Sequence, residues 1–416
     1  MAEKIVVIGQ GHAGLPLAVR AAEAGYLVVG VDIDAQRVER LLAGRSYIED
    51  VTDARLAAVL GCGRYSAGAD MAEAADFDIC VITVPAPLRG GAPDPSAVAD
   101  AAYAVAPYLR PGATVILESP AYPGTTDELL RELLEEGSGL RAPGDFHLGY
   151  SPERIDPGNP CWRLETIPKI VSGLDDAALA RVDRFYSTLV ERTVPVSTTR
   201  VAELAKLLEV TFRHVNIALV NEMAMLGPEL GVDVREAIEA AATKPFGHMR
   251  FTPGPGVGGE RPGVEPLWPP HRGAGRGSRL TELADAINAH MPEHVVGRIT
   301  RGLNHRRLPL RGSRVLVLGL AYKRNSGHLR ESAALRVAAE LHALGAHVRA
   351  VDPHVDQERV PDYIDLVRLT QEEVAGADAV AVLTDHDCFD YTMVGQHAAY
   401  VFDAHDRCQG HNVERL

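Results

Sequence analysis

Three glycines near the N-terminus are spaced for binding a phosphorylated cofactor. Gly9, Gly11 and Gly14 form a GxGxxG pattern after the apolar run KIVVIG (4–9), and Asp32 ends a second apolar run, YLVVGVD. In this pattern the glycines allow a tight turn, close approach of a pyrophosphate, and packing of a helix on a strand. The helix N-terminus binds the pyrophosphate, and an acid at the position of Asp32 accepts hydrogen bonds from a ribose diol. The sequence therefore predicts an NAD site and favours NAD over NADP.

A second candidate site lies in a loop rich in glycine and proline. The segment 251–266, FTPGPGVGGERPGVEP, contains five glycines and four prolines. This composition disfavours helix and strand and lets a ligand approach the backbone. The Arg261 guanidinium could bind a carboxylate or phosphate of the ligand. It could also simply pair with Glu265, four residues later, and both interpretations remain open.

Lysine is rare, which makes its positions informative. Removing five lysines from the 42 basic residues leaves 37 arginines. The lysines are Lys4, Lys169, Lys206, Lys244 and Lys323. A compact, titratable ammonium is a physical reason to retain lysine. We interpret Lys4 and Lys169 as incidental. Lys206 stands among apolar residues of a helix, where it could be functional or could extend along the apolar surface to solvent.

Alternating strand and helix patterns must position these residues. Apolar runs at 77–85, 113–119, 314–322, 347–352 and 378–385 predict further strands. Apolar residues at helical spacing predict one long helix over about 201–230 and another over about 279–304. We therefore predict an α/β fold of two Rossmann-like doubly wound domains joined by a long central helix. The second domain lacks GxGxxG, so we expect it to bind something other than a dinucleotide.

Motifs over nearly the whole chain resemble those of the UDP-glucose/GDP-mannose dehydrogenase family. They follow the family's order: GxGxxGLPLA, VPxPL (84–88), PGTT (123–126), YSPERIDPGN (150–159), AExxKLLE (202–209), NIALVNE (216–222), ATKPFG (242–247), GPGVGG (254–259), LGLAYK (318–323), LRES (329–332) and LTDHD (383–387). The most similar branch is bacterial and acts on UDP-N-acetylhexosamines. The resemblance implies an NAD-binding domain at 1–196, a central domain for dimerisation and substrate at 197–303, and a UDP-binding domain at 304–416.

The resemblance also implies a reaction and three of its residues. In the family, two hydrides leave C6 of a nucleotide sugar through a thioester on a cysteine. By position, Glu153 is the general acid/base, Lys206 stabilises developing oxyanions, and Glu265 replaces an aspartate that helps to activate water. The cysteine position is Arg261, and only the first hydride transfer can proceed without that nucleophile. Glu153 could instead only cap the chain or pair with Arg154.

Other departures from the family fall on the same machinery. Pro120 replaces a threonine, Val210 an asparagine one helical turn after Lys206, and Glu260 a histidine. A thiol relocated to Cys161 is conceivable, although an inert cysteine is the alternative. The segment 267–279 departs strongly, as a remodelled substrate end or as a surface insertion. Because the glycine turn is whole, the changes do not resemble random decay.

The remaining ligand contacts come from the glycine pattern and the resemblance. The predicted cofactor contacts are Gly9, Gly11, His12, Gly14, Asp32, Val84, Pro85, Glu118 and Arg330. The predicted substrate contacts are Arg154, Lys244, Phe246, Phe251, Gly254, Gly258, Tyr322 and Lys323. His12 could equally have a packing role.

Bulk properties exclude several classes of partner. The formal net charge of -14 disfavours nucleic acid. The five cysteines show neither a disulfide framework nor zinc spacing, and no metal site is predicted. No apolar run approaches the roughly 18 residues needed to cross a membrane. The N-terminus enters a strand at once, so we expect no signal peptide and a cytoplasmic protein. We expect a homodimer formed through the long helix.

Three functions remain open at this point. The favoured one is a single hydride transfer, which either releases an aldehyde or ketone or returns the hydride as an epimerase does. The second is a four-electron dehydrogenase that makes a uronic acid by another route. The third is a non-catalytic protein that still binds NAD and a nucleotide sugar.

Overall fold

The computed structural model describes residues 2–85, 88–89, 92–156, 159, 162–258, 278–329 and 331–416. These residues form two compact units, divided between Glu209 and Val210. The division falls inside α7 (Thr199–Leu230), the 32-residue helix that the sequence predicts. The division into three domains stays a prediction.

The first unit is built around a largely parallel sheet. Its described strands are ordered β10-β9-β8-β7-β4-β1-β2-β3, and only the β8–β9 pair is antiparallel. The strands are β1 (Lys4–Ile8), β2 (Leu27–Val31), β3 (Tyr65–Gly68), β4 (Ile79–Ile82), β7 (Thr114–Leu117), β8 (His147–Tyr150), β9 (Lys169–Gly173) and β10 (Thr193–Pro195). A separate antiparallel pair joins β5 (Leu88–Arg89) to β6 (Ala92–Pro93). The run from β3 to β8 has the strand order of a dinucleotide-binding fold.

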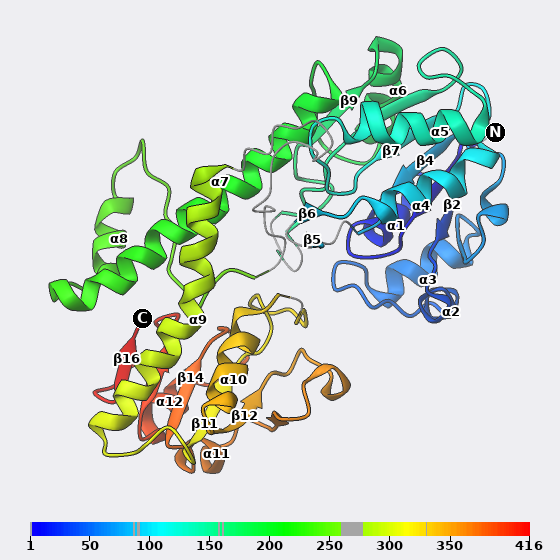
Figure 1. Ribbon diagram of the computed structural model, residues 1–416. Coiled ribbons are helices and arrows are strands. Elements are labelled where there is room, and N and C mark those ends of the chain that lie inside the picture. The colour runs from blue at the N-terminus through cyan, green and yellow to red at the C-terminus, as the bar shows by residue number, and fades with distance from the viewer. Residues whose placement is uncertain are drawn as a thin grey trace. The chain divides into compact units, whose positions relative to one another are not determined.

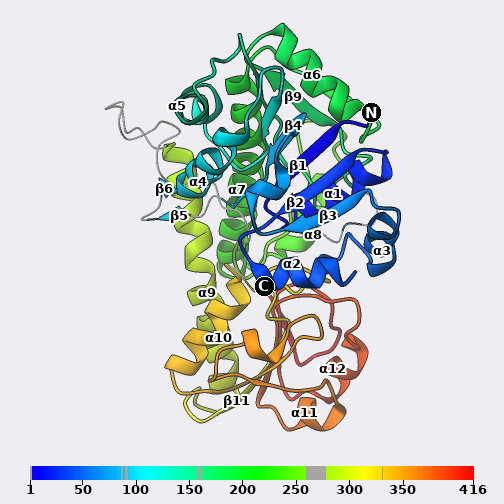
Figure 2. The same cartoon turned by 90° about the vertical axis from the view of Figure 1, so that its right-hand side faces the viewer.

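Helices cover both faces of this sheet. They are α1 (Gly14–Glu23), α2 (Ala35–Leu42), α3 (Asp53–Gly61), α4 (Ser96–Val105), α5 (Arg131–Ser138) and α6 (Asp176–Ser187). Alternate residues of β1 point to opposite faces: Ile5 and Val7 pack with α1, α3 and α6, whereas Val6 and Ile8 pack with α4 and α5. Figure 2 shows these two helical layers on either side of the sheet. A strand buried on both faces explains why KIVVI is apolar throughout.

The second unit repeats the same plan. Its sheet is parallel and ordered β13-β12-β11-β14-β15-β16. The strands are β11 (Arg314–Leu318), β12 (His347–Val351), β13 (Asp365–Leu366), β14 (Ala379–Val382), β15 (Val401–Asp403) and β16 (Val413–Arg415). Numbered by appearance, both sheets share the order 3-2-1-4-5-6 of the doubly wound fold. The predicted α/β fold with two Rossmann-like domains and a long central helix is confirmed.

Helices of different lengths complete the second unit. They are α8 (Val234–Ala242), α9 (Arg279–His305), α10 (Ala333–Ala343), α11 (Gln371–Ala375) and α12 (Tyr391–His397). One face of the sheet packs on α9 and α10, and the other on α11 and α12 (Figure 1). The helix α9 matches the predicted span of about 279–304. Among the described residues, none of the helices combines the length and apolar character needed to span a bilayer.

Candidate functional site

The three glycines of the N-terminal turn meet three different requirements. Gly9 follows β1 with a φ of 89°, in the left-handed region that favours glycine. A Cβ on Gly14, the first residue of α1, would lie 1.8 Å from the backbone oxygen of Gly9. A Cβ on Gly11 would meet nothing within 4 Å. Gly9 and Gly14 are therefore needed to build the turn, whereas Gly11 leaves space where the pattern places a pyrophosphate.

Asp32 follows β2 and lies against the same turn. Its Oδ2 accepts the Gln10 N–H at 2.8 Å, and its Oδ1 accepts the Asp34 N–H at 2.9 Å. Arg37 Nη1 lies 3.5 Å from Oδ2. An ionised carboxylate offers about four acceptor positions, so Asp32 keeps acceptor capacity for a ribose hydroxyl. Arg37 was not predicted from the sequence, although its position in α2, five residues after Asp32, indicated that it could reach this carboxylate.

Three more predicted cofactor residues lie near this turn. His12 is half-buried within the turn itself. Val84 is half-buried and Pro85 is exposed, and both follow β4, the neighbour of β1 in the sheet. Carboxyl ends of adjacent parallel strands meet at one edge, so these residues share the edge where doubly wound folds bind ligands. Their contacts with a cofactor remain predictions.

Glu118 has a surrounding that the sequence did not reveal. It follows β7, its side chain is 0% exposed, and its Oε1 lies 3.0 Å from the Nζ of the buried Lys169. The Tyr186 hydroxyl donates to the same oxygen, and the Lys169 ammonium lies 5.0 Å from the Tyr186 ring centre. Burial and the nearby Glu153 raise the pKa of Glu118, against the lowering effects of Lys169 and Tyr186. Our interpretation of Lys169 as incidental was wrong.

Glu153 and Lys206 are brought together. Glu153 lies three residues after β8, and the Lys206 Nζ donates to its backbone oxygen at 2.6 Å. The Oε1 of Glu153 accepts the backbone N–H groups of Arg154 and Ile155. Its Oε2 is buried and has no hydrogen-bond partner among the described residues. Glu153 thus caps its own loop, as the structural alternative stated, yet it keeps one oxygen that can accept a proton, while the Lys206 ammonium bonds the backbone of the same residue.

Arg154 points away from Glu153. Its guanidinium pairs with Glu209, with Nη2 2.5 Å from Oε1, and also donates to the Pro168 carbonyl. The pair lines a surface pocket together with Asp156, Asn159, Trp162 and Ile167. The Trp162 side chain is exposed at this pocket. Arg154 is therefore available from the surface for the predicted substrate contact, although Glu209 already engages it.

Glu203 fastens the turn that follows β7 to helix α7. Its carboxylate accepts the backbone N–H groups of Gly124 and Thr126 at 2.8 and 2.9 Å, and the Thr126 hydroxyl at 2.7 Å. Burial raises the pKa of Glu203 to about 7, although these donors favour the ionised form. Lys206 lies one helical turn further along α7. Glu203 therefore joins Lys206 to the turn that contains Pro120. The glutamate of the AExxK pattern, three residues before Lys206, indicated this contact, but Glu203 was not predicted as a site residue.

In the second unit, residues 251–258, the described part of the glycine-proline loop, are packed on other parts of the chain. A Cβ on Gly256 would lie 2.9 Å from the Ala333 Cβ, and one on Gly258 would lie 2.6 Å from the Tyr322 Cβ. Close chain packing thus accounts for these two glycines, where we had expected approach of a ligand. The Phe251 ring contacts Phe212 of α7 edge to face, with centres 5.8 Å apart.

The other predicted substrate residues of this unit lie in loops. Lys244 stands over the ring of Phe246 at 5.0 Å, and Phe246 is 71% exposed. Tyr322 and Lys323 follow β11, and the Tyr322 N–H donates to the His328 carbonyl at 2.9 Å. Val210 lies on α7 four residues after Lys206, as expected. The roles of these residues stay predictions.

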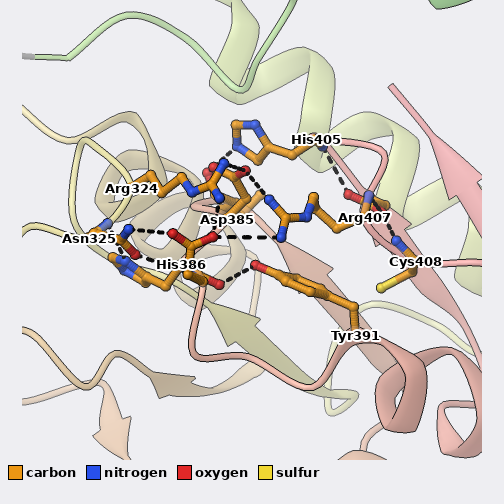
Figure 3. A network of polar contacts seen from close by, with 12 residues as sticks. Arg324, Asn325, Asp385, His386, Tyr391, His405, Arg407 and Cys408 are labelled. Atoms are coloured by element: carbon orange, nitrogen blue, oxygen red, sulfur yellow. Dashed lines mark hydrogen bonds and ion pairs between the residues drawn. The ribbon is translucent and has the colours of Figure 1, made fainter. Parts of the chain in front are cut away.

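Polar contacts hold Arg324 and Asn325, the first two residues of the segment 324–328, which departs from the family that the chain resembles (Figure 3). Arg324 pairs with Asp387, and the Asn325 Nδ2 donates to the same carboxylate at 2.6 Å. Arg407 Nη1 donates to Asp385 at 2.9 Å and its guanidinium stands over the Tyr391 ring. The two arginines are matched by two carboxylates, so the described part of this network offers no net positive charge to an anion.

Asp352 occupies the place in the second sheet that Asp32 has in the first. It follows β12, and its Oδ2 accepts the N–H groups of Leu320 and Ala321 at 2.8 and 2.9 Å. His386 Nε2 donates to Oδ2 at 3.1 Å, because its Nδ1 accepts the Asn325 N–H. The His354 N–H occupies Oδ1. Burial alone would raise the pKa of Asp352, but these donors hold that pKa below its usual value. The carboxylate is saturated, so it has no place for a ribose.

Several predicted residues lie outside the described part of the chain. These are Arg261, Glu265 and Arg330, together with Glu260, Cys161 and most of the segment 267–279. Among the described residues, no group of three or more acidic, histidine or cysteine side chains is arranged to hold a metal ion.

Comparisons with known families match three consecutive parts of the chain. Residues 3–190 match the NAD-binding domain of the UDP-glucose/GDP-mannose dehydrogenase family, residues 200–289 its central domain, and residues 316–409 its UDP-binding domain. The first match supports NAD as the cofactor of the glycine turn, and the third supports a UDP-sugar as the ligand of the second sheet.

Individual relatives cover most of the chain. UDP-N-acetyl-D-mannosamine dehydrogenase from Pyrococcus horikoshii is 35% identical over 387 residues, which is 93% of this chain and 90% of that protein. UDP-N-acetyl-D-glucosamine 6-dehydrogenase from Pseudomonas aeruginosa is 34% identical over 359 residues, or 85% and 84% of the two chains. The solved structure of the UDP-D-ManNAc dehydrogenase from Pyrococcus horikoshii superposes with a TM-score of 0.87 at 32% identity, covering 99% of each chain.

Proposed function

This chain belongs to the UDP-glucose/GDP-mannose dehydrogenase family, and from that premise we propose that it transfers a single hydride between a UDP-sugar and NAD. The observation that carries the proposal is the contact between Lys206 and Glu153, where the Nζ lies 2.6 Å from the backbone oxygen. An acid/base and a cation therefore lie in one unit with the glycine turn. By resemblance, the nucleophile position holds Arg261, whose guanidinium cannot form a thioester.

The chemistry assigned to each residue follows from charge. Bound NAD supplies the hydride acceptor. Glu153 accepts the proton of the sugar hydroxyl at its free Oε2, while the C–H electron pair leaves the same carbon as hydride, so a carbonyl forms. Lys206 stabilises the partial negative charge on the alcohol oxygen as its proton leaves and it becomes the carbonyl oxygen. Arg261 replaces covalent catalysis with a fixed positive charge, which also suits a sugar that already carries a carboxylate.

A four-electron dehydrogenase is the second candidate, because the relatives at 34% and 35% identity are named as N-acetylhexosamine dehydrogenases. Incubation with NAD and UDP-N-acetylglucosamine or UDP-N-acetylmannosamine separates the outcomes. One NADH per sugar with a carbonyl product establishes single transfer with release. Isomerised sugar without NADH establishes epimerisation. Two NADH and a uronic acid would support the second candidate, and binding without any turnover would leave a non-catalytic homologue.

Removal of either group of the pair should lower turnover strongly. We expect Glu153→Gln and Lys206→Met each to reduce kcat by about 10²- to 10⁴-fold, the usual contribution of a positioned proton-transfer group. NAD affinity should stay unchanged, because neither residue belongs to the glycine turn. Arg181→Met is the matched control, since Arg181 pairs with Glu3 away from this loop. Turnover of the Lys206 and Glu153 variants within threefold of the unaltered protein would exclude these roles.

We also propose that two copies associate through α7. Apolar side chains recur along it at spacings of three, four or seven residues and are substantially exposed: Val201, Leu204, Leu208, Phe212, Leu219, Met223, Leu226 and Leu230. Leu208 is 67% exposed and Leu219 is 52% exposed. A helix with such a stripe is stabilised by packing on another helix, and in a homodimer the partner presents the same stripe.

The association can be tested at single positions. Leu208→Glu or Leu219→Glu should convert the dimer to a monomer, because a carboxylate would be buried without a partner at the interface. Light scattering after gel filtration measures the mass directly. Leu344→Glu is the control: Leu344 is an exposed leucine outside α7, so this variant should remain dimeric. A monomeric unaltered protein, or a Leu208→Glu dimer of unaltered affinity, would refute the assignment.

A further inference from the structure

Two buried asparagines link helices α7 and α9 to the glycine-proline loop. The side chain of Asn221 on α7 is fully buried, and that of Asn288 on α9 is nearly so. The Oδ1 of Asn221 accepts the backbone N–H of Gly254 at 2.9 Å. Its Nδ2 donates to the Oδ1 of Asn288 at 2.9 Å, and the Asn288 Nδ2 donates to the His214 carbonyl at 3.2 Å. Each amide therefore has one orientation, fixed by its partners.

This pair is not what helix packing alone would select. Burying an amide costs free energy unless its hydrogen bonds are satisfied, and apolar side chains of similar size would fill the same space without that cost. Apart from His214, buried residues close to the pair along the two helices are apolar, such as Ala218 and Ala224 of α7 and Met291 of α9. The loop supplies the reason for the amides. Residues 251–258 form no helix or strand, so the Gly254 N–H needs a partner outside regular structure.

The loop is held on its other side by the second sheet. Gly256 fits against Ala333 at the start of α10, and Gly258 fits against Tyr322 just after β11. Pro253, Pro255 and Val257 are buried, and each is followed by a glycine. The loop therefore alternates buried apolar residues with glycines that allow close approach. Asn221 is the side chain on α7 that fixes its backbone at Gly254, so the loop has its shape before any ligand arrives.

We propose that Asn221, oriented by Asn288, is a positioning residue that preorganises the loop 251–258 for the nucleoside diphosphate part of the substrate. The inference rests on the proposed function, in which this unit holds a UDP-sugar. A loop that is already ordered loses less conformational entropy on binding, so loosening it weakens affinity without removing any ligand contact. Asn221 itself need not touch the ligand.

Two variants separate positioning from mere stability. Asn221→Leu removes the partner of the Gly254 N–H and the donor to the Asn288 Oδ1. It should therefore lower both the melting temperature and the affinity for UDP. Asn221→Leu combined with Asn288→Leu removes both amides and restores apolar packing between the helices. We expect the double variant to regain most of the melting temperature but to bind UDP about tenfold more weakly, which corresponds to about 1.4 kcal/mol.

Calorimetric titration with UDP and, separately, with NAD provides the measurement. NAD affinity should be unchanged in both variants, because its site lies in the other unit. Asn216→Leu is the matched control: Asn216 is half-buried on the same helix, and its amide bonds only the Phe212 carbonyl among the described residues. Recovery of UDP affinity together with stability in the double variant would overturn the inference. Failure of the unaltered protein to bind UDP would instead refute the proposed function.

Hydrogen exchange on the single variant tests the same point if the double variant does not fold. The amides of 251–258 should exchange faster in Asn221→Leu, while those of α10 and β11 keep their protection. Unchanged protection of the loop would show that Asn221 does not hold it.

Discussion

Replacing Gly11 by alanine should reduce NAD affinity by about 100-fold, or about 2.7 kcal/mol, and leave the melting temperature almost unchanged. A Cβ at this position meets no protein atom within 4 Å, and Gly11 is not among the glycines with positive φ. The protein has no structural need for glycine there. The new methyl group would instead occupy the space that the glycine pattern reserves for the pyrophosphate.

Gly14→Ala is the contrasting variant. Its Cβ would lie 1.8 Å from the Gly9 oxygen and 2.4 Å from Thr83 Oγ1, so α1 would have to move away from β1. Overpacking of this kind costs roughly 1–3 kcal/mol or more, and both stability and NAD affinity should fall. Thermal melting and titration with NAD distinguish the two cases. A Gly11→Ala protein that binds NAD normally would show that the cofactor does not lie on this turn.

Replacing Lys169 by methionine should lower the free energy of unfolding by about 3–5 kcal/mol, because it leaves the Glu118 carboxylate buried without its ammonium. Glu118 and Lys169 side chains are only 0% and 4% exposed, so water cannot take the place of the lost partner. Urea unfolding at neutral pH measures the loss. Adding Glu118→Gln should recover much of it, because the amide is neutral and its oxygen still accepts the Tyr186 hydroxyl.

The pH dependence gives a second check on this pair. Burial raises the pKa of Glu118 in the folded state above its value of about 4.3 in an unfolded chain. Such a group binds its proton more tightly when folded, so its unfavourable contribution is complete above the folded pKa and disappears as the pH falls below it. Removing Lys169 also removes the main group that lowers this pKa, so the Lys169→Met defect should shrink as the pH is lowered from neutral towards the unfolded value. Lys4→Met, at a lysine that bonds only backbone carbonyls among the described residues, should show a small defect without this trend. A pH-independent Lys169→Met defect would contradict the assignment.

Local patterns were enough to predict the secondary structure that builds both sheets. Runs such as KIVVI and RVLVL are apolar on both faces because helices cover both faces of a parallel sheet. The helical spacing of apolar residues over about 201–230 likewise predicts a single helix, which is α7. The glycine turn could be predicted because its signal is local: Gly9 and Gly14 allow the turn itself, and Gly11 leaves space beside it.

Pairs distant in the sequence could not be derived in the same way. Lys169 meets Glu118 because β9 runs antiparallel to β8 and brings its first residue back to the carboxyl end of β7. Asn221 meets Gly254 only when α7 and the loop are packed together. No spacing rule contains these contacts. The resemblance placed Glu153 and Lys206 in one site, but only the three-dimensional structure shows that Lys206 bonds the backbone oxygen of Glu153. Arg261, Glu265 and Arg330 stay predictions, as they lie outside the described residues.

The two sheets share strand order, a glycine with positive φ after the first strand, and an aspartate after the second, yet only one aspartate remains free to receive a sugar hydroxyl. His386 and three backbone amides close the other. We therefore expect each chain to bind the adenosine ribose of NAD at one site only, so titration with NAD should saturate at a single equivalent. We expect the second sheet, whose aspartate is occupied, to bind a different nucleotide without competing for NAD.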